Sequence, residues 1–151
     1  MAVGAGVVLA CALACAAQAN AQEEGFWRAA SSAAASVTGD IAISDAKVTI
    51  DYWVFPATPI RSLKPVEVSA VFDADVNAGI NGDLYRLRVP PDKRFLHHNT
   101  LCGSAETQWM ATYVTGRTLR VAFFSGDDMP VFTFDTISNS TTLCGTYTYA
   151  R

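Results

Sequence analysis

The amino-acid sequence predicts an all-β protein, a small antiparallel barrel or sandwich of about eight strands. Three observations lead to this fold class. Apolar and polar residues alternate over several short segments, turn-forming residues separate those segments at hairpin spacing, and the middle of the chain shows no helical period. Because full closure removes exposed strand edges, the small barrel is favoured over the sandwich.

The expected strands follow one another after residue 37, in a single domain that spans residues 37–151. They cover residues 41–44, 48–54, 66–76, 84–89, 107–115, 118–125, 131–135 and 143–150. Asp45-Ala46, Asn81-Gly82 and Gly116-Arg117 are expected in turns between them, and Pro90-Pro91 ends a strand because proline cannot donate to the ladder. Residues 22–36 are Ala/Ser-rich, which predicts a short N-terminal helix or a loose linker.

Residues 1–21 have the composition of a signal peptide. The stretch is apolar, rich in small residues and uncharged, and Ala19-Asn20-Ala21 satisfies the small-x-small rule for cleavage. The expected location is therefore periplasmic or secreted. Two alternatives stay open: a lipoprotein signal ending at Cys11, which would attach the protein to a membrane, and a transmembrane anchor, for which the apolar run is shorter than the ~20 residues needed.

Two cysteines, Cys102 and Cys144, remain after the expected cleavage. An even pair in an oxidising compartment predicts one disulfide, and the alternative is two buried free thiols. The chain-entropy model gives such a loop of about 43 residues a stabilisation of about 4 kcal/mol.

Several short motifs follow one another along the chain. Thr38-Gly39-Asp40-Ile41 comes first, Leu84-Tyr85-Arg86 and Pro90-Pro91 follow, Asn99 precedes Leu101-Cys102-Gly103, and the end reads Leu143-Cys144-Gly145-Thr146-Tyr147-Thr148-Tyr149. In this layout the chain resembles small exported bacterial proteins of unassigned function with two Leu-Cys-Gly motifs. The resemblance implies export and the disulfide, and carries no activity. A more distant likeness, at the level of the fold alone, is to envelope barrels that inhibit lysozyme.

Four residues are candidates for a binding site. His97-His98 are adjacent and would suit a metal or acid/base site, but neighbouring strand residues point to opposite faces and no third ligand accompanies them. Arg86 and Arg88 alternate on an expected outward face and would suit an anion, although such residues commonly serve solubility. Asp73, Asp75 and Asn77 have the start of a calcium-loop spacing without its glycine or closing acid. No metal or cofactor is expected.

Charge and missing motifs restrict the function. The net charge is −3 and the basic residues are scattered, so nucleic acid is not an expected partner. No nucleophile, zinc or phosphate-loop motif occurs, so the expected catalytic set is none. The leading interpretation is a non-enzymatic binding or inhibitory module of the bacterial envelope, whose partner is an unknown protein or a small apolar ligand. The alternatives are a secreted hydrolase that uses His97 or His98 with an aspartate, and a structural envelope component.

Overall fold

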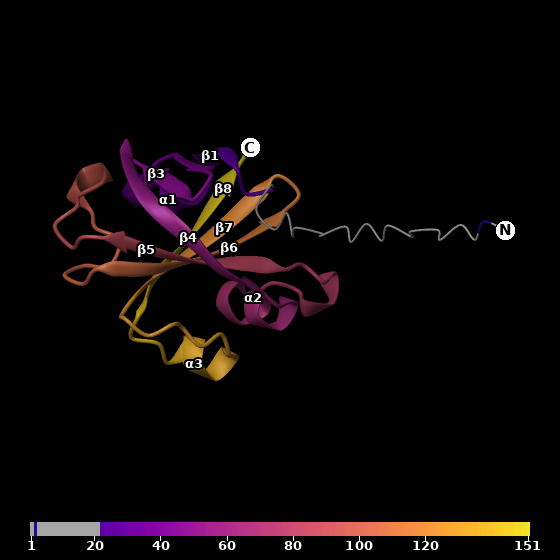
Figure 1. Cartoon of the computed structure of the whole chain (residues 1–151). Helices are drawn as coiled ribbons and strands as arrows, with labels where there is room; N and C mark the ends of the chain where they lie inside the picture. Colours follow the sequence, from indigo (N-terminus) through magenta and orange to yellow (C-terminus); the bar gives the residue numbers. More distant parts are fainter. Residues whose placement is uncertain (1, 3–21) are drawn as a thin grey trace.

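The computed structural model describes Ala2 and residues 22–151, which form a closed barrel of eight antiparallel strands in chain order (Figure 1). The strands are β1 (Gly25–Ala29), β2 (Ile41–Ser44), β3 (Lys47–Ile50), β4 (Trp53–Leu63), β5 (Gly82–Val89), β6 (Thr107–Thr115), β7 (Thr118–Ser125) and β8 (Leu143–Ala150). Each strand pairs with the next, and β1 pairs with β8, with Arg28 opposite Ala150. The predicted all-β barrel is confirmed. Apart from Ala2, the expected signal peptide, including Cys11, lies outside the described residues.

Three short helices accompany the barrel: α1 (Ser32–Val37), α2 (Pro65–Phe72) and α3 (Phe134–Ser138), with 3-10 turns η1 (Val76–Ala78) and η2 (Leu96–His98). Helix α1 is the short N-terminal helix that the composition predicted, and the Ser31 hydroxyl caps it by accepting the Ala34 N–H at 3.1 Å. The same segment also holds β1, which closes the barrel. None of the described helices is long and apolar enough to cross a membrane.

The strand predicted over residues 66–76 is wrong, because residues 65–72 form helix α2. Pro65 suits the first turn of a helix, and the Glu67 carboxylate accepts the backbone N–H of Lys64 at 2.9 Å. The alternation that suggested a strand also contains a helical spacing, and its members Val68, Val71 and Phe72 are the buried residues of α2.

Three further boundaries differ from the prediction. Residues 131–135 were expected as a strand, but α3 begins at Phe134, where the Thr133 hydroxyl caps it. The strand expected over 48–54 is interrupted at Asp51 and Tyr52, both with positive φ, so it becomes the hairpin of β3 and β4. Gly82 begins β5 instead of forming a turn, and a Cβ there would lie 2.5 Å from the Thr112 carbonyl.

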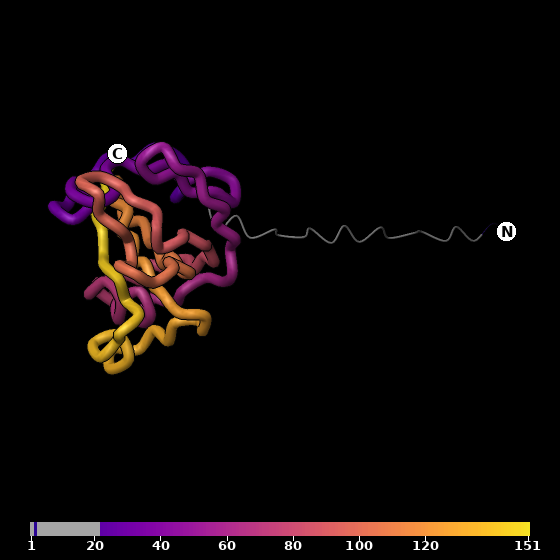
Figure 2. The backbone as a smooth tube through the Cα atoms, turned by 90° about the vertical axis from the view of Figure 1, so that its left-hand side faces the viewer, coloured from indigo at the N-terminus to yellow at the C-terminus, as the bar shows by residue number. Residues whose placement is uncertain are grey.

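Both faces of the barrel wall carry apolar clusters. The interior is filled by side chains, among them Trp27, Val48, Ile50 and Phe123, all fully buried. A second cluster lies on the outer face, where α2 and the segment 126–138 cover β5 to β7. Figures 1 and 2 both show α2 and α3 on the same side of the barrel. The wall of the barrel is therefore buried from both sides at this place.

The neighbouring residues Phe123 and Phe124 show how one strand serves both clusters. Phe123 points inward and packs edge-on against Tyr147, with ring centroids 5.5 Å apart. Phe124 points outward and packs edge-on against Phe132, with centroids 5.8 Å apart.

The predicted disulfide is present between Cys102 and Cys144, whose Cα atoms lie 5.0 Å apart. It ties the loop between β5 and β6 to the start of β8. Leu101, next to the first cysteine, is buried in the interior cluster. The bond therefore holds a loop that contributes to the core.

Candidate functional site

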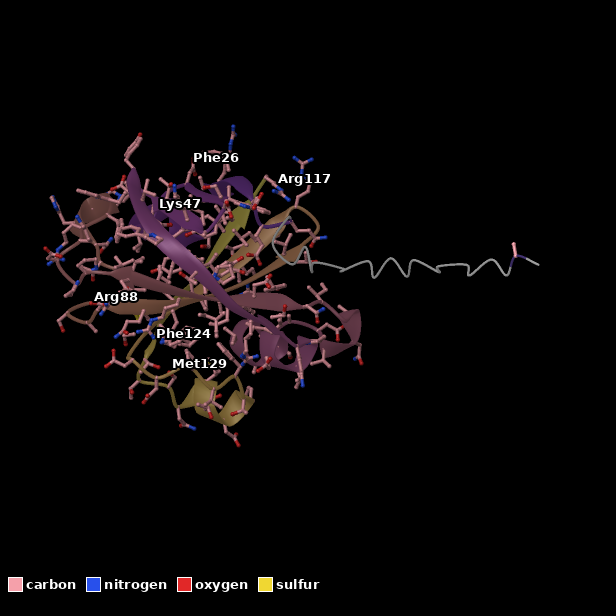
Figure 3. All side chains as sticks on the ribbon, viewed as in Figure 1. Phe26, Lys47, Arg88, Arg117, Phe124 and Met129 are labelled. Atoms are coloured by element: carbon pink, nitrogen blue, oxygen red, sulfur yellow. A yellow bond between two sulfur atoms is a disulfide. The ribbon has the colours of Figure 1, made fainter. Side chains whose placement is uncertain are left out.

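A groove lies outside the barrel, between helix α2 and the chain segment that leads into α3. Its volume is about 780 Å³, within the range typical of ligand sites. One wall is formed by Val66 and Ala70 of α2, and the other by Val131, Phe132 and Phe134. Figure 3 labels Met129, which also lines the groove, in the lower part of the molecule.

Large apolar side chains in this groove face solvent. Phe134 is 73% exposed, Val66 60% and Val131 57%, and Met129 is exposed as well. A contiguous apolar surface of this kind costs solvation free energy, and it commonly marks a binding surface. Phe132 alone is buried, against Phe124 of the barrel wall.

The polar rim of the groove is partly self-neutralised. Arg61 donates two hydrogen bonds to the Glu67 carboxylate, at 2.8 and 3.0 Å. These hydrogen bonds hold the pKa of Glu67 below its usual value. Lys64 and Asp73 also line the groove, and neither forms a salt bridge with a described residue. The groove thus offers an apolar floor with one cation and one anion left unpaired by the described chain.

A second candidate site surrounds Glu23, at the end of the barrel where β5 begins. Glu23 is 3% exposed, and its carboxylate accepts hydrogen bonds from the Tyr85 hydroxyl at 2.6 Å and from the Thr112 hydroxyl. Burial raises the pKa of Glu23 to about 7, the nearby Asp83 adds to the rise, and the two hydroxyl donors oppose it. The pKa of Asp83 is also raised by burial. Glu23 can therefore take up or release a proton near neutral pH.

The Glu23 site opens into a mainly polar pocket of about 450 Å³, which Ser62 and Asp83 help to line. The backbone around Glu23 is tightly held: the Trp27 indole donates to the Glu23 carbonyl at 2.7 Å, and Arg151 donates to the carbonyls of Gln22 and Glu24 at 2.7 and 2.8 Å. The chain therefore closes this end of the barrel with a titratable group pointing inward.

The two histidines singled out from the sequence lie in an exposed turn and do not form part of a metal-binding cluster among the described residues. His97 and His98 are exposed, in a turn between β5 and β6 where both have positive φ. His98 lines an open depression with Asp92 and Arg94. The described residues contain no group of three His, Cys, Asp or Glu side chains placed to hold a metal ion.

The two arginines make contacts within the fold. Arg86 stacks over Trp109, with 4.3 Å from its guanidinium carbon to the ring centroid, and it donates to Gln108 and to the Asp127 carbonyl. Arg88 is exposed and forms a salt bridge of 2.9 Å with Glu106. Each guanidinium thus already has partners, and neither joins the histidines in one site.

Sequence reasoning missed both the groove and the Glu23 site. The groove depends on recognising α2, for which Pro65 with Glu67 was the available signal. Glu23 carried no signal, because an acid that follows an apolar, small-residue N-terminal stretch resembles an exposed terminus. The chain matches no protein-family model, and no curated protein or solved structure is significantly similar to it, so its function has to be inferred from its own geometry.

Proposed function

We propose that this protein is an exported, non-enzymatic binding module, and that a partner protein docks in the groove beside α2. The observation that carries the proposal is the exposure of Val66, Val131 and Phe134 around one open groove. Export is supported by the signal-like residues 1–21 and by the disulfide, which forms and persists in oxidising compartments.

A protein partner is favoured over a small apolar ligand for a structural reason. Barrels that carry small ligands usually hold them inside, but here bulky side chains such as Trp27, Phe123 and Tyr149 fill the interior. The apolar groove lies outside and opens to solvent. A surface of this shape suits a partner that brings its own apolar side chains.

The test uses two valines with matched exposure on different surfaces. Val131 is 57% exposed in the groove, and Val54 is 58% exposed on β4, outside it. A photo-crosslinking amino acid is placed at each position in the cells that make the protein, and the adducts are identified by mass spectrometry. The partner found at position 131 is then purified and titrated against wild type, Val131→Glu and Val54→Glu.

We expect Val131→Glu to weaken binding of that partner at least tenfold and Val54→Glu to leave it within twofold. Both changes add one charge to an exposed valine, so both variants should melt close to wild type. Equal binding of the partner to all three proteins, or an adduct formed at position 54 alone, would contradict the proposal.

A further inference from the structure

The chain beside the groove contains a segment whose backbone forms no hydrogen bond with a described residue, and which leads into the extended backbone of Thr133. Residues 129–132 belong to no helix or strand, and no described residue forms a hydrogen bond with a backbone N–H or C=O group of theirs. Hydrogen bonds hold only the preceding loop, where Trp109 and Arg86 donate to the carbonyls of Gly126 and Asp127 at 3.0 and 3.1 Å. Every strand of the barrel is paired on both sides, whereas this segment presents free backbone groups beside an apolar groove.

The segment is held in place by its side chains and by its two ends. Phe132 is buried against Phe124, and the Arg61 guanidinium lies 5.7 Å from the centroid of its ring. Pro130 fixes its own φ and has no N–H to leave unpaired. Thr133 caps α3 and so fixes the far end. A backbone that is already held in place loses less entropy when another strand pairs with it.

The groove is placed to receive alternate side chains of such a strand. In an extended chain, every second side chain points to the same face. Val66 and Ala70 face Val131 and Phe134 across the groove, so side chains entering it would be buried between two apolar walls. Strand addition works in this way: the main chain gives affinity and the pockets for alternate side chains give specificity.

The charges at the two ends of α2 define the flanks of the partner segment. Lys64 is the N-cap of α2 and Asp73 its C-cap, and the Glu67 carboxylate between them is occupied by Arg61. A helix of eight residues is about 12 Å long, which equals about four residues of an extended chain. A segment with an acid at one end, a base at the other and about four residues between them is complementary to this rim.

We propose that the partner of this site binds by strand addition, as an extended, alternately apolar segment flanked by an acid and a base. The inference rests on the proposed function, since it names the kind of partner segment that the same groove takes. The partner's main chain pairs with residues 129–132, and its alternate side chains enter the groove beside α2.

The experiment uses the processed, oxidised protein and short synthetic peptides. The first probe is acetyl-Asp-Val-Thr-Val-Thr-Lys-amide, and the second carries the same core with Asp and Lys exchanged. Two further versions of the better binder are N-methylated, one on the two valines and the other on the two threonines. Because the N–H groups of adjacent residues point to opposite edges of a strand, the two valines share one edge and the two threonines the other, so each version blocks one edge only.

We expect the better peptide to shift the backbone amide resonances of Val131, Phe132 and Thr133 in a saturable NMR titration. We expect one N-methylated version to bind at least tenfold more weakly and the other to bind within twofold of the parent. The exchange of Asp and Lys should change the affinity at least threefold.

Equal binding of both N-methylated versions would overturn strand addition while leaving the groove as a binding site. The absence of any shift at these three amides would also overturn it. Equal affinity for the two charge orders would overturn the assignment of Lys64 and Asp73 as the flanking contacts. The proposed function is overturned by a separate result: binding of the crosslinked partner to Val131→Glu with the wild-type affinity.

Discussion

Raising the pH from about 4.5 to about 7 should destabilise this protein, because the folded protein keeps the buried Glu23 carboxyl protonated over this range. In the folded state the pKa of Glu23 is about 7, mainly through burial, whereas its ordinary value is 4.5. Between these two values the folded protein binds more protons than the unfolded chain, so stability is highest below 4.5 and falls as the pH rises. At about 1.4 kcal/mol per pH unit, the difference corresponds to a loss of about 3 kcal/mol by the time the pH exceeds 7. The raised pKa of Asp83 acts in the same direction.

The substitution Glu23→Gln isolates this effect. The amide keeps the size of the side chain and stays neutral at every pH, so the variant should be more stable than wild type above pH 7. Its unfolding free energy should also depend far less on pH. Urea denaturation at several pH values between 4.5 and 8 measures both quantities.

Glu24→Gln is the matched control, because it removes the same charge from the next residue, whose side chain is exposed. The control should keep the wild-type dependence on pH. The reasoning is refuted if Glu23→Gln retains the full wild-type slope, or if Glu24→Gln removes it.

Three further predictions concern the core and the wall of the barrel. Replacing Cys102 and Cys144 by serine should lower the unfolding free energy by about 4 kcal/mol, since the unfolded chain regains the freedom of a closed loop; equal melting of the oxidised and reduced protein would contradict this. Gly82→Ala should lower the unfolding free energy by about 1–3 kcal/mol, because the new Cβ would lie 2.5 Å from a backbone oxygen. Gly145→Ala should lower it less, because the nearest atom to its Cβ belongs to a side chain at 3.3 Å. Calorimetry of the two variants measures the difference. Phe123→Ala should lower the unfolding free energy, measured by urea denaturation, by about 3–5 kcal/mol, since the ring is fully buried. A loss below 1 kcal/mol would mean that the interior repacks around the missing ring.

The parts of the fold that could be predicted from the sequence are those in which local pattern and tertiary structure agree. The hairpin at Gly116-Arg117, the strand end at Pro90 and the pairing of Cys102 with Cys144 all follow from local chemistry or simple counting. The split of Phe123 and Phe124 between two faces follows from the two-residue period of a strand.

Helix α2 could not be predicted from alternation, because its apolar residues satisfy both periods. Val66 and Val68 are two apart, as in a strand, while Val68, Val71 and Phe72 have helical spacing, and the apolar pattern alone does not decide between them. The groove could therefore not be predicted from this pattern, since α2 forms one of its walls. The burial of Glu23 depends on Tyr85 and Thr112, which are distant in sequence, and no local signal announces such a contact.

The seam between β1 and β8 determines the order in which this molecule can be completed. Arg28 pairs with Ala150, and Ala29 with Tyr149, so the first strand of the barrel can complete its pairing only with the last strand, β8. The side chain of Arg151 then donates hydrogen bonds to the carbonyls of Gln22 and Glu24, just before β1. Until β8 has been synthesised, β1 lacks the strand that closes the sheet, and ring closure is a late event dominated by contacts distant in sequence. We therefore expect the barrel to remain open during synthesis and to close only after β8 has left the ribosome.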